Sequence, residues 1–392
     1  MADEVYYCEA CGGIMEFDVK TQALKCPNCD TVVQIANNSE DIVEHTLDMN
    51  AINKIRVEEK TTVTMACSGC GAPIEVESNS TALSCPYCGS SYVIADKQAE
   101  TIVPDGVVTF KITVADAKDI FRNWIKKRYL APNALKNLYQ HGKFQGMYIP
   151  YWTFDADAHA YYRAMGGRNR TETYKDSNGN THTRTVTDWY ATTGNVRRFF
   201  DDVLVCAAER NDKILLNGID NYDTKNMPSY SPDYLSGYGS EVYSVDLKTG
   251  HDKAIRIMSE TLRSMAADDV LKRYDEVKDV RIDAHFNDET YKHVLVPVYS
   301  TNYSFKGKNY TVLINGENGA IKGEYPKSVA KIVAIIVAVA AALILIFSLM
   351  GRDSDYYEKN DYNSSTLLCD ECDEIVYEYE MPEDVSADFM EV

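Results

Sequence analysis

Hydrophobic positions in the centre of the chain first follow a helical period and then alternate as in β-strands. From Val114 to Ile125 the apolar residues recur at helical spacing, with Lys118, Arg122 and the basic run 126–128 on the other side. This pattern predicts an amphipathic helix over 114–129. A solvated helix surface is the commoner meaning of such a basic face, and contact with anionic lipid stays open.

After Pro150 the pattern becomes that of β-strands. Asp176–Asn180 predicts a hairpin turn between two arms rich in tyrosine and threonine. The remaining elements that the pattern predicts are a strand at 196–206, short and long helices at 213–216 and about 253–267, and strands at 294–305 and 309–314. Together they predict an α+β domain with antiparallel pairing over residues 101–327.

One apolar run near the end of the chain has a different character. Ile332–Met350 carries no charge, and Ser348 is its only hydroxyl residue. As a helix the run measures about 28 Å, close to the hydrocarbon thickness of a bilayer. A buried core helix is the alternative, but such helices are usually shorter and carry a polar stripe. The sequence therefore predicts one transmembrane helix over 328–350.

Charges beside this helix predict its orientation. Lys322, Lys327 and Lys331 precede the apolar run, whereas Arg352 is the basic residue close behind it. The positive-inside rule then places the large N-terminal part in the cytoplasm and the C-terminal tail outside. The acidic N-terminus has no apolar run behind it, so we expect no secretory signal peptide.

Cysteine spacing in the first hundred residues reveals an internal repeat. Two C-x-x-C pairs separated by 14 residues recur 59 positions later, together with Gly12 as Gly71, Pro27 as Pro86 and several other residues. The eight cysteines are Cys8, Cys11, Cys26, Cys29, Cys67, Cys70, Cys85 and Cys88. We therefore expect two tandem copies of one small unit.

This spacing is typical of zinc ribbons. Each C-x-x-C turn brings two thiolates onto one tetrahedral ion, and two turns complete a closed site with no open position for catalysis. The sequence predicts two structural Zn²⁺ ions per chain, which would supply the folding energy of such small units. Disulfides, a rubredoxin-like iron site and a thioredoxin-like redox pair are the alternatives that fit less well.

Composition and charge limit the classes of function. The 392 residues suggest two to three domains, and 25% charged with 45% hydrophobic residues is ordinary for a globular protein. The net charge is −19, and residues 1–100 hold 6 Lys/Arg against 16 Asp/Glu. An acidic ribbon region argues against nucleic acid as a partner.

No catalytic motif stands out, so we expect a protein that is not an enzyme. Asp155, Asp157 and His159 alternate on one strand, where a solvated strand face is a better explanation than a phosphotransferase site. The acidic pairs 201–202 and 268–269 are predicted to lie on the surface. Cys206 ends an apolar strand and is predicted to be an inert core thiol.

The tail from residue 351 holds 2 Lys/Arg against 14 Asp/Glu and is predicted to be disordered. Its pair Cys369 and Cys372 cannot complete a tetrahedral site alone, so its role and redox state stay unassigned. The predicted domains are ribbon 1 at 1–36, a linker at 37–66, ribbon 2 at 67–96, the α+β platform at 101–327, the transmembrane helix at 328–350 and the acidic tail at 351–392.

The order of these parts, with the segment Tyr148–Ala156 (Tyr-Ile-Pro-Tyr-Trp-Thr-Phe-Asp-Ala), resembles a family of bacterial membrane-anchored TFIIB-type zinc-ribbon proteins. Members are often labelled primosomal or helicase-like. In Gram-positive bacteria such proteins are similar to the zinc-ribbon member of a membrane-stress complex. The resemblance implies an SPFH-domain protein and a phage-shock-protein-A-like protein as partners.

Three hypotheses follow from the sequence. The first is a non-enzymatic membrane adaptor whose ribbons dock proteins. The second is a nucleic-acid-binding factor, and the third is a thiol-based redox or chaperone role that uses the tail cysteines. The sequence does not decide whether the chain forms a homo-oligomer, which proteins dock, or what signal is sensed.

Overall fold

A computed structural model describes residues 6–36, 42–48, 52, 102–133, 135, 144–209 and 213–350, and four strands between residues 62 and 93. The chain divides into two compact units, residues 1–329 and 330–392. The first unit contains a mixed α+β fold with predominantly antiparallel pairing, which confirms the predicted class.

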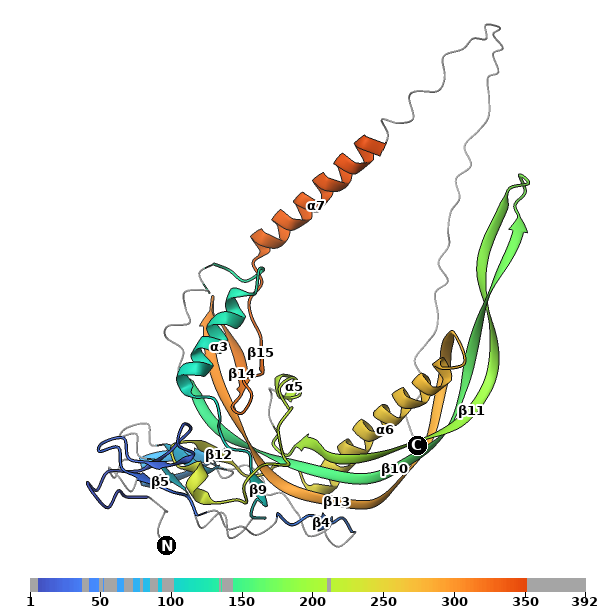
Figure 1. Cartoon of the computed structure of the whole chain (residues 1–392). Coiled ribbons are helices and arrows are strands. Elements are labelled where there is room, and N and C mark those ends of the chain that lie inside the picture. The colour runs from blue at the N-terminus through green and yellow to red at the C-terminus, as the bar shows by residue number, and fades with distance from the viewer. Residues whose placement is uncertain are drawn as a thin grey trace, which may run out of the picture. The chain divides into compact units, whose positions relative to one another are not determined.

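Three long antiparallel strands form the centre of the first unit: β10 (Gln145–Lys175), β11 (Thr181–Cys206) and β13 (Glu276–Phe305). β10 lies between the other two and pairs with both along most of its length (Figure 1). The sheet continues from β13 through β14 (Lys308–Asn315) and β15 (Ile321–Gly323). Shorter strands complete it: β12 (Gly239–Glu241), β7 (Ser80–Ser84), β8 (Ser91–Val93), β9 (Gly106–Val107) and β4 (His45–Thr46).

Helix α6 (Leu247–Leu271) covers the concave face of the three long strands (Figure 1). Asp246 caps it by accepting the Thr249 amide at 2.7 Å. Its buried residues recur every four positions, at Ala254, Met258, Leu262, Ala266 and Val270. Small residues on β10 receive this face, namely Ala156, Ala158 and Ala160, all fully buried. Short side chains on the strand let the helix approach the sheet closely.

The two strands paired with β10 contain β-bulges where β10 bends. β11 and β13 each contain an extra residue opposite 154–157, and β13 contains another opposite 163–165. Asp202, Asp288 and Asp279 lie at these points with φ near +50°, a conformation that aspartate tolerates better than most residues. Such bulges bend a strand and increase its twist, and Figure 1 shows β10 and β13 strongly curved.

A second helix, α3 (Val114–Lys126), packs on the other end of the sheet near β14 and β15 (Figure 1). The Thr113 hydroxyl accepts the Asp116 amide, and the Asp116 carboxylate accepts the Thr113 amide, both at 3.2 Å. This reciprocal capping box fixes the start of the helix. Phe121, Trp124 and Ile125 form its buried face. The amphipathic helix predicted from the sequence is therefore confirmed.

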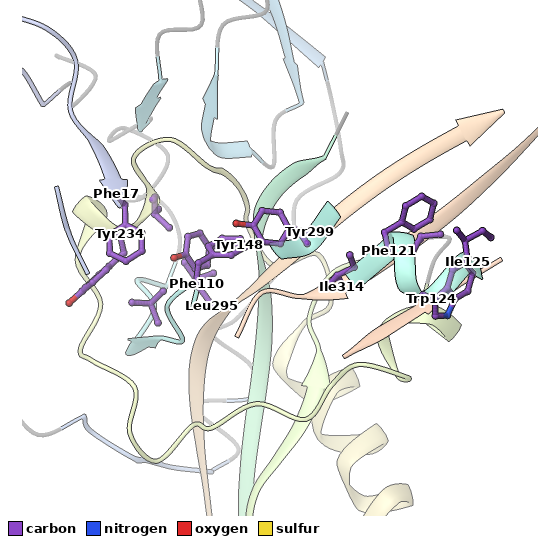
Figure 2. Packing of buried hydrophobic residues seen from close by; sticks show 14 of the residues in the cluster. Phe17, Phe110, Phe121, Trp124, Ile125, Tyr148, Tyr234, Leu295, Tyr299 and Ile314 are labelled. Atoms are coloured by element: carbon purple, nitrogen blue, oxygen red, sulfur yellow. The ribbon is translucent and has the colours of Figure 1, made fainter. Parts of the chain in front are cut away.

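The core beneath α3 is largely aromatic. Phe110 stands at its centre, with ring centroids 4.2 Å from Tyr238, 4.7 Å from Tyr299 and 5.2 Å from Tyr148. Figure 2 shows members of this cluster extending from Phe17 to the residues of α3. Rings packed in this way stabilise the fold by more than the burial of their apolar area alone.

Most of the other predicted elements are confirmed, but the strands are longer than expected. The turn at 176–180 joins β10 to β11, and α5 (Lys213–Leu216) is the short helix. The predicted strands at 196–206 and 294–305 are the last parts of β11 and β13. α6 extends past its predicted bounds at both ends.

The C-terminal helix α7 (Val329–Met350) contains the predicted apolar segment. Val329–Phe347 is long and apolar enough to cross a membrane, with a mean hydropathy of 3.0 over its most apolar window. This is compatible with a single-pass membrane protein. The tail from residue 351, with Cys369 and Cys372, lies outside the described residues.

Gly250 of α6 provides a test of the helix–sheet contact. A Cβ there would lie 2.7 Å from Cδ1 of Trp152, whose indole donates to the Val245 carbonyl at 2.9 Å and is held in place. We expect Gly250→Ala to lower the free energy of unfolding by about 1–3 kcal/mol, because the core is overpacked. Ser264→Ala, at an exposed position of the same helix, is the control. Thermal unfolding of the detergent-solubilised chain measures both, and an unchanged or higher melting temperature for Gly250→Ala would contradict the packing.

Candidate metal centre

Four of the eight predicted ligands come together at one point. The Sγ atoms of Cys8, Cys11, Cys26 and Cys29 all lie within 4.8 Å of one another. Two of the sulfur–sulfur distances, Cys8–Cys29 and Cys11–Cys26, are 3.5 Å. Cys8 and Cys26 are buried, whereas Cys11 and Cys29 are exposed.

Two similar turns position these sulfurs. In the first, the Gly12 amide donates to the Cys8 carbonyl at 2.8 Å, and in the second the Asp30 amide donates to the Cys26 carbonyl at 3.0 Å. Gly12 and Asp30 each follow the second cysteine of a pair and have φ of +70° and +60°. Glycine adopts this left-handed conformation without strain, and aspartate fills the equivalent position in the second turn because it tolerates the same conformation.

The donor set fits zinc. Four thiolates at about 2.3 Å from a tetrahedral ion stand about 3.8 Å apart, close to the distances here. The Thr31 hydroxyl, 3.1 Å from Sγ of Cys29, lowers the pKa of that thiol to about 6 by hydrogen bonding to the thiolate. Zinc bound here would hold the two turns together, and with four sulfur ligands it would have no open position for a substrate.

The strands of this ribbon connect it to the platform. β1 (Glu16–Asp18), β2 (Ala23–Lys25) and β3 (Val32–Val33) form a three-stranded antiparallel sheet. The Phe17 amide donates to the Ser236 carbonyl at 3.0 Å, and the Ser236 hydroxyl donates to the Met15 carbonyl at 2.8 Å. The Phe17 ring packs edge-on against Tyr234 with centroids 5.5 Å apart. The ribbon therefore shares the core of the platform.

A side chain of the ribbon strengthens this attachment. Gln22 has φ of +52° and lies between β1 and β2. Its amide nitrogen donates to the Phe110 carbonyl at 2.8 Å, and its amide oxygen accepts from the Thr109 hydroxyl at 2.7 Å. Both polar groups of the side chain are thus satisfied at the boundary between ribbon and platform.

The four cysteines predicted for ribbon 2, Cys67, Cys70, Cys85 and Cys88, lie outside the described residues. Strands around them are described, and β7 pairs with β8 in the register of β2 with β3. Leu24↔Val33 in the first repeat corresponds to Leu83↔Tyr92 in the second. β5 (Thr62–Ala66) pairs with β6 (Pro73–Glu77), and β7 adds to the platform sheet beside β12.

Asp155 corrects one expectation from the sequence. It is 4% exposed, so the solvated strand face predicted for it is wrong. Its carboxylate accepts the Asp202 amide at 2.6 Å and the Thr290 hydroxyl at 2.8 Å. Burial raises the pKa of this carboxyl. The bulges opposite 154–157 bring these partners to Asp155.

Asp202 was predicted to be a surface residue, and its side chain is also buried. The carboxylate pairs with the Lys292 ammonium at 2.7 Å, and both side chains are 7% exposed. Burial opposes the charge of Lys292, but the ion pair with Asp202 keeps its pKa above the usual value. Asp155, Asp201 and Asp202 have oxygens close enough for a metal ion, but Lys292 and Lys225 already supply cations to this cluster.

The other candidate residues are accounted for by ordinary contacts. Asp157 pairs with Arg197, and His159 stacks on His285 with centroids 5.1 Å apart. Asp269 accepts the Tyr162 hydroxyl at 2.5 Å. Cys206 is half-buried. These contacts are structural, and they bring no catalytic group together among the described residues.

Sequence reasoning missed the buried Lys292 and its ion pairs with Asp202 and Glu44. These residues are separated by up to 248 positions along the chain, so no local spacing connects them. The one signal in the sequence is that Lys292 lies within the largely apolar segment Tyr291–Val298. A lysine buried there needs a carboxylate partner, because an unpaired lysine is rarely buried.

Comparison with known proteins gives one distant relative. No family model matches the chain, and no solved structure does. The chain is similar to the uncharacterized protein YdjG of Bacillus subtilis (strain 168), with 25% identity over 346 residues. The alignment covers 88% of this chain and 97% of the relative.

Metal analysis tests the cysteine centre. We expect the purified chain to carry two zinc ions and Cys26→Ser to carry one, because three thiolates do not close a structural site. Cys206→Ser, which changes a cysteine outside the cluster, should keep both ions. Elemental analysis by mass spectrometry measures the stoichiometry. Full zinc content in Cys26→Ser, or iron in place of zinc, would contradict this assignment.

Two lysine–aspartate pairs allow a matched test of burial. Lys292→Met leaves the Asp202 carboxylate buried without its cation, which we expect to cost about 3–5 kcal/mol of unfolding free energy. Lys225→Met breaks the pair with Asp201, whose side chain is 39% exposed, and should cost less than about 1 kcal/mol. Denaturant unfolding compares the two variants, and equal losses would show that burial does not set the strength of these pairs.

Proposed function

We propose that this protein is a non-enzymatic membrane-anchored scaffold whose zinc ribbons dock other proteins. The observation that carries the proposal is the closed set of four cysteines on a ribbon that shares its core with the platform. A closed site suits a structural role for zinc. The Phe17 ring packs against Tyr234 of η1 (Pro232–Leu235), and the backbones of Phe17 and Met15 bond to the following Ser236, which makes the ribbon a rigid part of the platform.

The apolar helix α7 supports the anchoring part of the proposal. Its length and hydropathy suit a single bilayer crossing. With Lys322, Lys327 and Lys331 on its N-terminal side, the orientation proposed is ribbons and platform in the cytoplasm and the tail outside.

The ribbon offers a surface for a partner. β3 is the edge strand of its three-stranded sheet, and Val32 and Val33 are 41% and 46% exposed. Exposed apolar side chains on a strand edge are typical of protein contacts. From the family resemblance, the partners proposed are an SPFH-domain protein and a phage-shock-protein-A-like protein, in a response to membrane stress.

Co-purification after crosslinking in native membranes tests the scaffold. We expect protein partners that survive nuclease treatment, and we expect Val32→Glu/Val33→Glu to reduce their recovery at least about tenfold by placing charge at the contact. This variant leaves the four cysteines intact. Cys206→Ser serves as the control that keeps full recovery.

Two results would contradict the proposal. Unchanged recovery both in Val32→Glu/Val33→Glu and in Cys67→Ser/Cys70→Ser would exclude docking through the ribbons. Recovery only of nucleic-acid machinery, lost on nuclease treatment, would favour a nucleic-acid-binding factor.

A further inference from the structure

The chain approaches the apolar helix along the C-terminal end of α3. The Ser328 amide donates to the Leu130 carbonyl at 2.8 Å, and Val329 is the first residue of α7. Leu130 therefore lies beside the point at which the first unit ends. This holds however the two units are oriented, because both partners of the hydrogen bond belong to the first unit and Ser328 is bonded to Val329.

Aromatic contacts hold the same approach segment against α3. The Tyr325 ring packs edge-on against Trp124 with centroids 5.8 Å apart. The Arg128 guanidinium lies 4.7 Å from the Trp124 ring centroid and 5.6 Å from that of Tyr325. Trp, Tyr and Arg are side chains that favour the interface between membrane and water.

Basic residues gather at this end of the first unit. Lys126 and Lys127 are exposed, and neither forms an ion pair within the described part of the chain. Residues 123–133 contain three basic and no acidic residues, and residues 325–331 contain two lysines and no acidic residue. The acidic residues of α3, Asp116 and Asp119, belong to its first half.

The geometry places these charges within reach of lipid headgroups. The Arg128 amide donates to the Ile125 carbonyl and the Ala131 amide to the Arg128 carbonyl, so the segment after α3 stays compact. Lys126 is the last residue of α3 and stands four positions before Leu130. The headgroup layer is about 5–7 Å thick and the Debye length about 8 Å, so a charge this close to the bilayer entry interacts with the membrane surface.

We propose that the C-terminal end of α3, with Lys126, Lys127 and Arg128, binds the phosphates of anionic lipids where the chain enters the membrane. This rests on the proposed anchoring by α7. Each basic residue at an anionic surface strengthens association roughly fivefold. The contact adds three basic residues, some 200 positions from α7 in sequence, to the charges on the cytoplasmic side of the membrane.

Lysine labelling of the full chain in nanodiscs tests this contact. Discs contain phosphatidylcholine alone or with phosphatidylglycerol, and mass spectrometry follows acetylation at each lysine. We expect Lys126 and Lys127 to react about threefold more slowly in the anionic discs, an effect that high salt removes. Lys175 of β10 and Lys248 of α6 should react equally in both.

A pair of variants gives a second readout. Phosphatidylglycerol should raise the melting temperature of the wild-type chain and of Lys175→Gln/Lys248→Gln in detergent. It should leave that of Lys126→Gln/Lys127→Gln unchanged. All three chains keep the apolar helix, and the two double variants have the same net charge.

The outcomes separate this inference from the anchoring. Incorporation into both kinds of disc with equal reactivity of Lys126 and Lys127 overturns the lipid contact and leaves the anchor standing. If Lys126 and Lys127 react more slowly than Lys175 and Lys248 to the same extent in both kinds of disc, something other than anionic lipid covers them, and this result also overturns the lipid contact. Failure to enter either disc overturns the anchor and the contact together.

Discussion

The pairing of β10 with both β11 and β13 is the constraint on which the rest of this protein depends. A strand bonded on both edges has its side chains fixed in alternating directions over its whole length. One face of β10 receives α6 through its alanines, and its first residues take part in the aromatic core beneath α3. Helices α3 and α6 pack on this frame, and the short strands β4, β9 and β12 pair with it.

The attachment of ribbon 1 to the platform determines what a metal ion bound to its four cysteines would stabilise. In a ribbon on a flexible linker, zinc would stabilise only the fold of the ribbon itself. Here β1 places Phe17 in a core that also contains Phe110 and Leu295, so metal binding and platform packing would stabilise the same folded state. The second repeat reaches the platform by another route, through β7 beside β12. The first repeat is thus attached by side-chain packing and hydrogen bonds to Ser236, and the second by a strand that joins the platform sheet.

Local patterns in the sequence were enough to predict α3, the turn at 176–180 and the cysteine cluster. In each case the residues that matter lie close together in sequence: apolar residues at helical spacing, five turn residues, or two C-x-x-C pairs. The full lengths of β10 and β13 were not predictable from pattern alone, because Gly166, Gly167 and Asp279 interrupt the strand signal. Pairing with neighbours overrides such weak formers.

The burial of Asp155 and Lys292 depends on contacts between distant positions and on bulges that sequence alternation does not reveal. The approach of Ser328 to Leu130 is of the same kind. It joins a basic helix to a segment almost 200 positions later, and it gives residues 126–128 a different meaning from the one that their helical period alone suggested.

The last eight pairs of β10 and β11, from Arg168↔Asp188 to Lys175↔Thr181, extend past the start of β13 as a two-stranded arm (Figure 1). Cross-strand charges such as Arg170 with Asp188 and Arg184 with Glu172 hold it, and its side chains are mostly exposed. Since the arm buries little apolar surface, its backbone opens and exchanges amide hydrogens at a small fraction of the free energy needed to unfold the sheet. The tip at Asn178 and Gly179 is therefore where the chain can be cut or lengthened while the core stays folded.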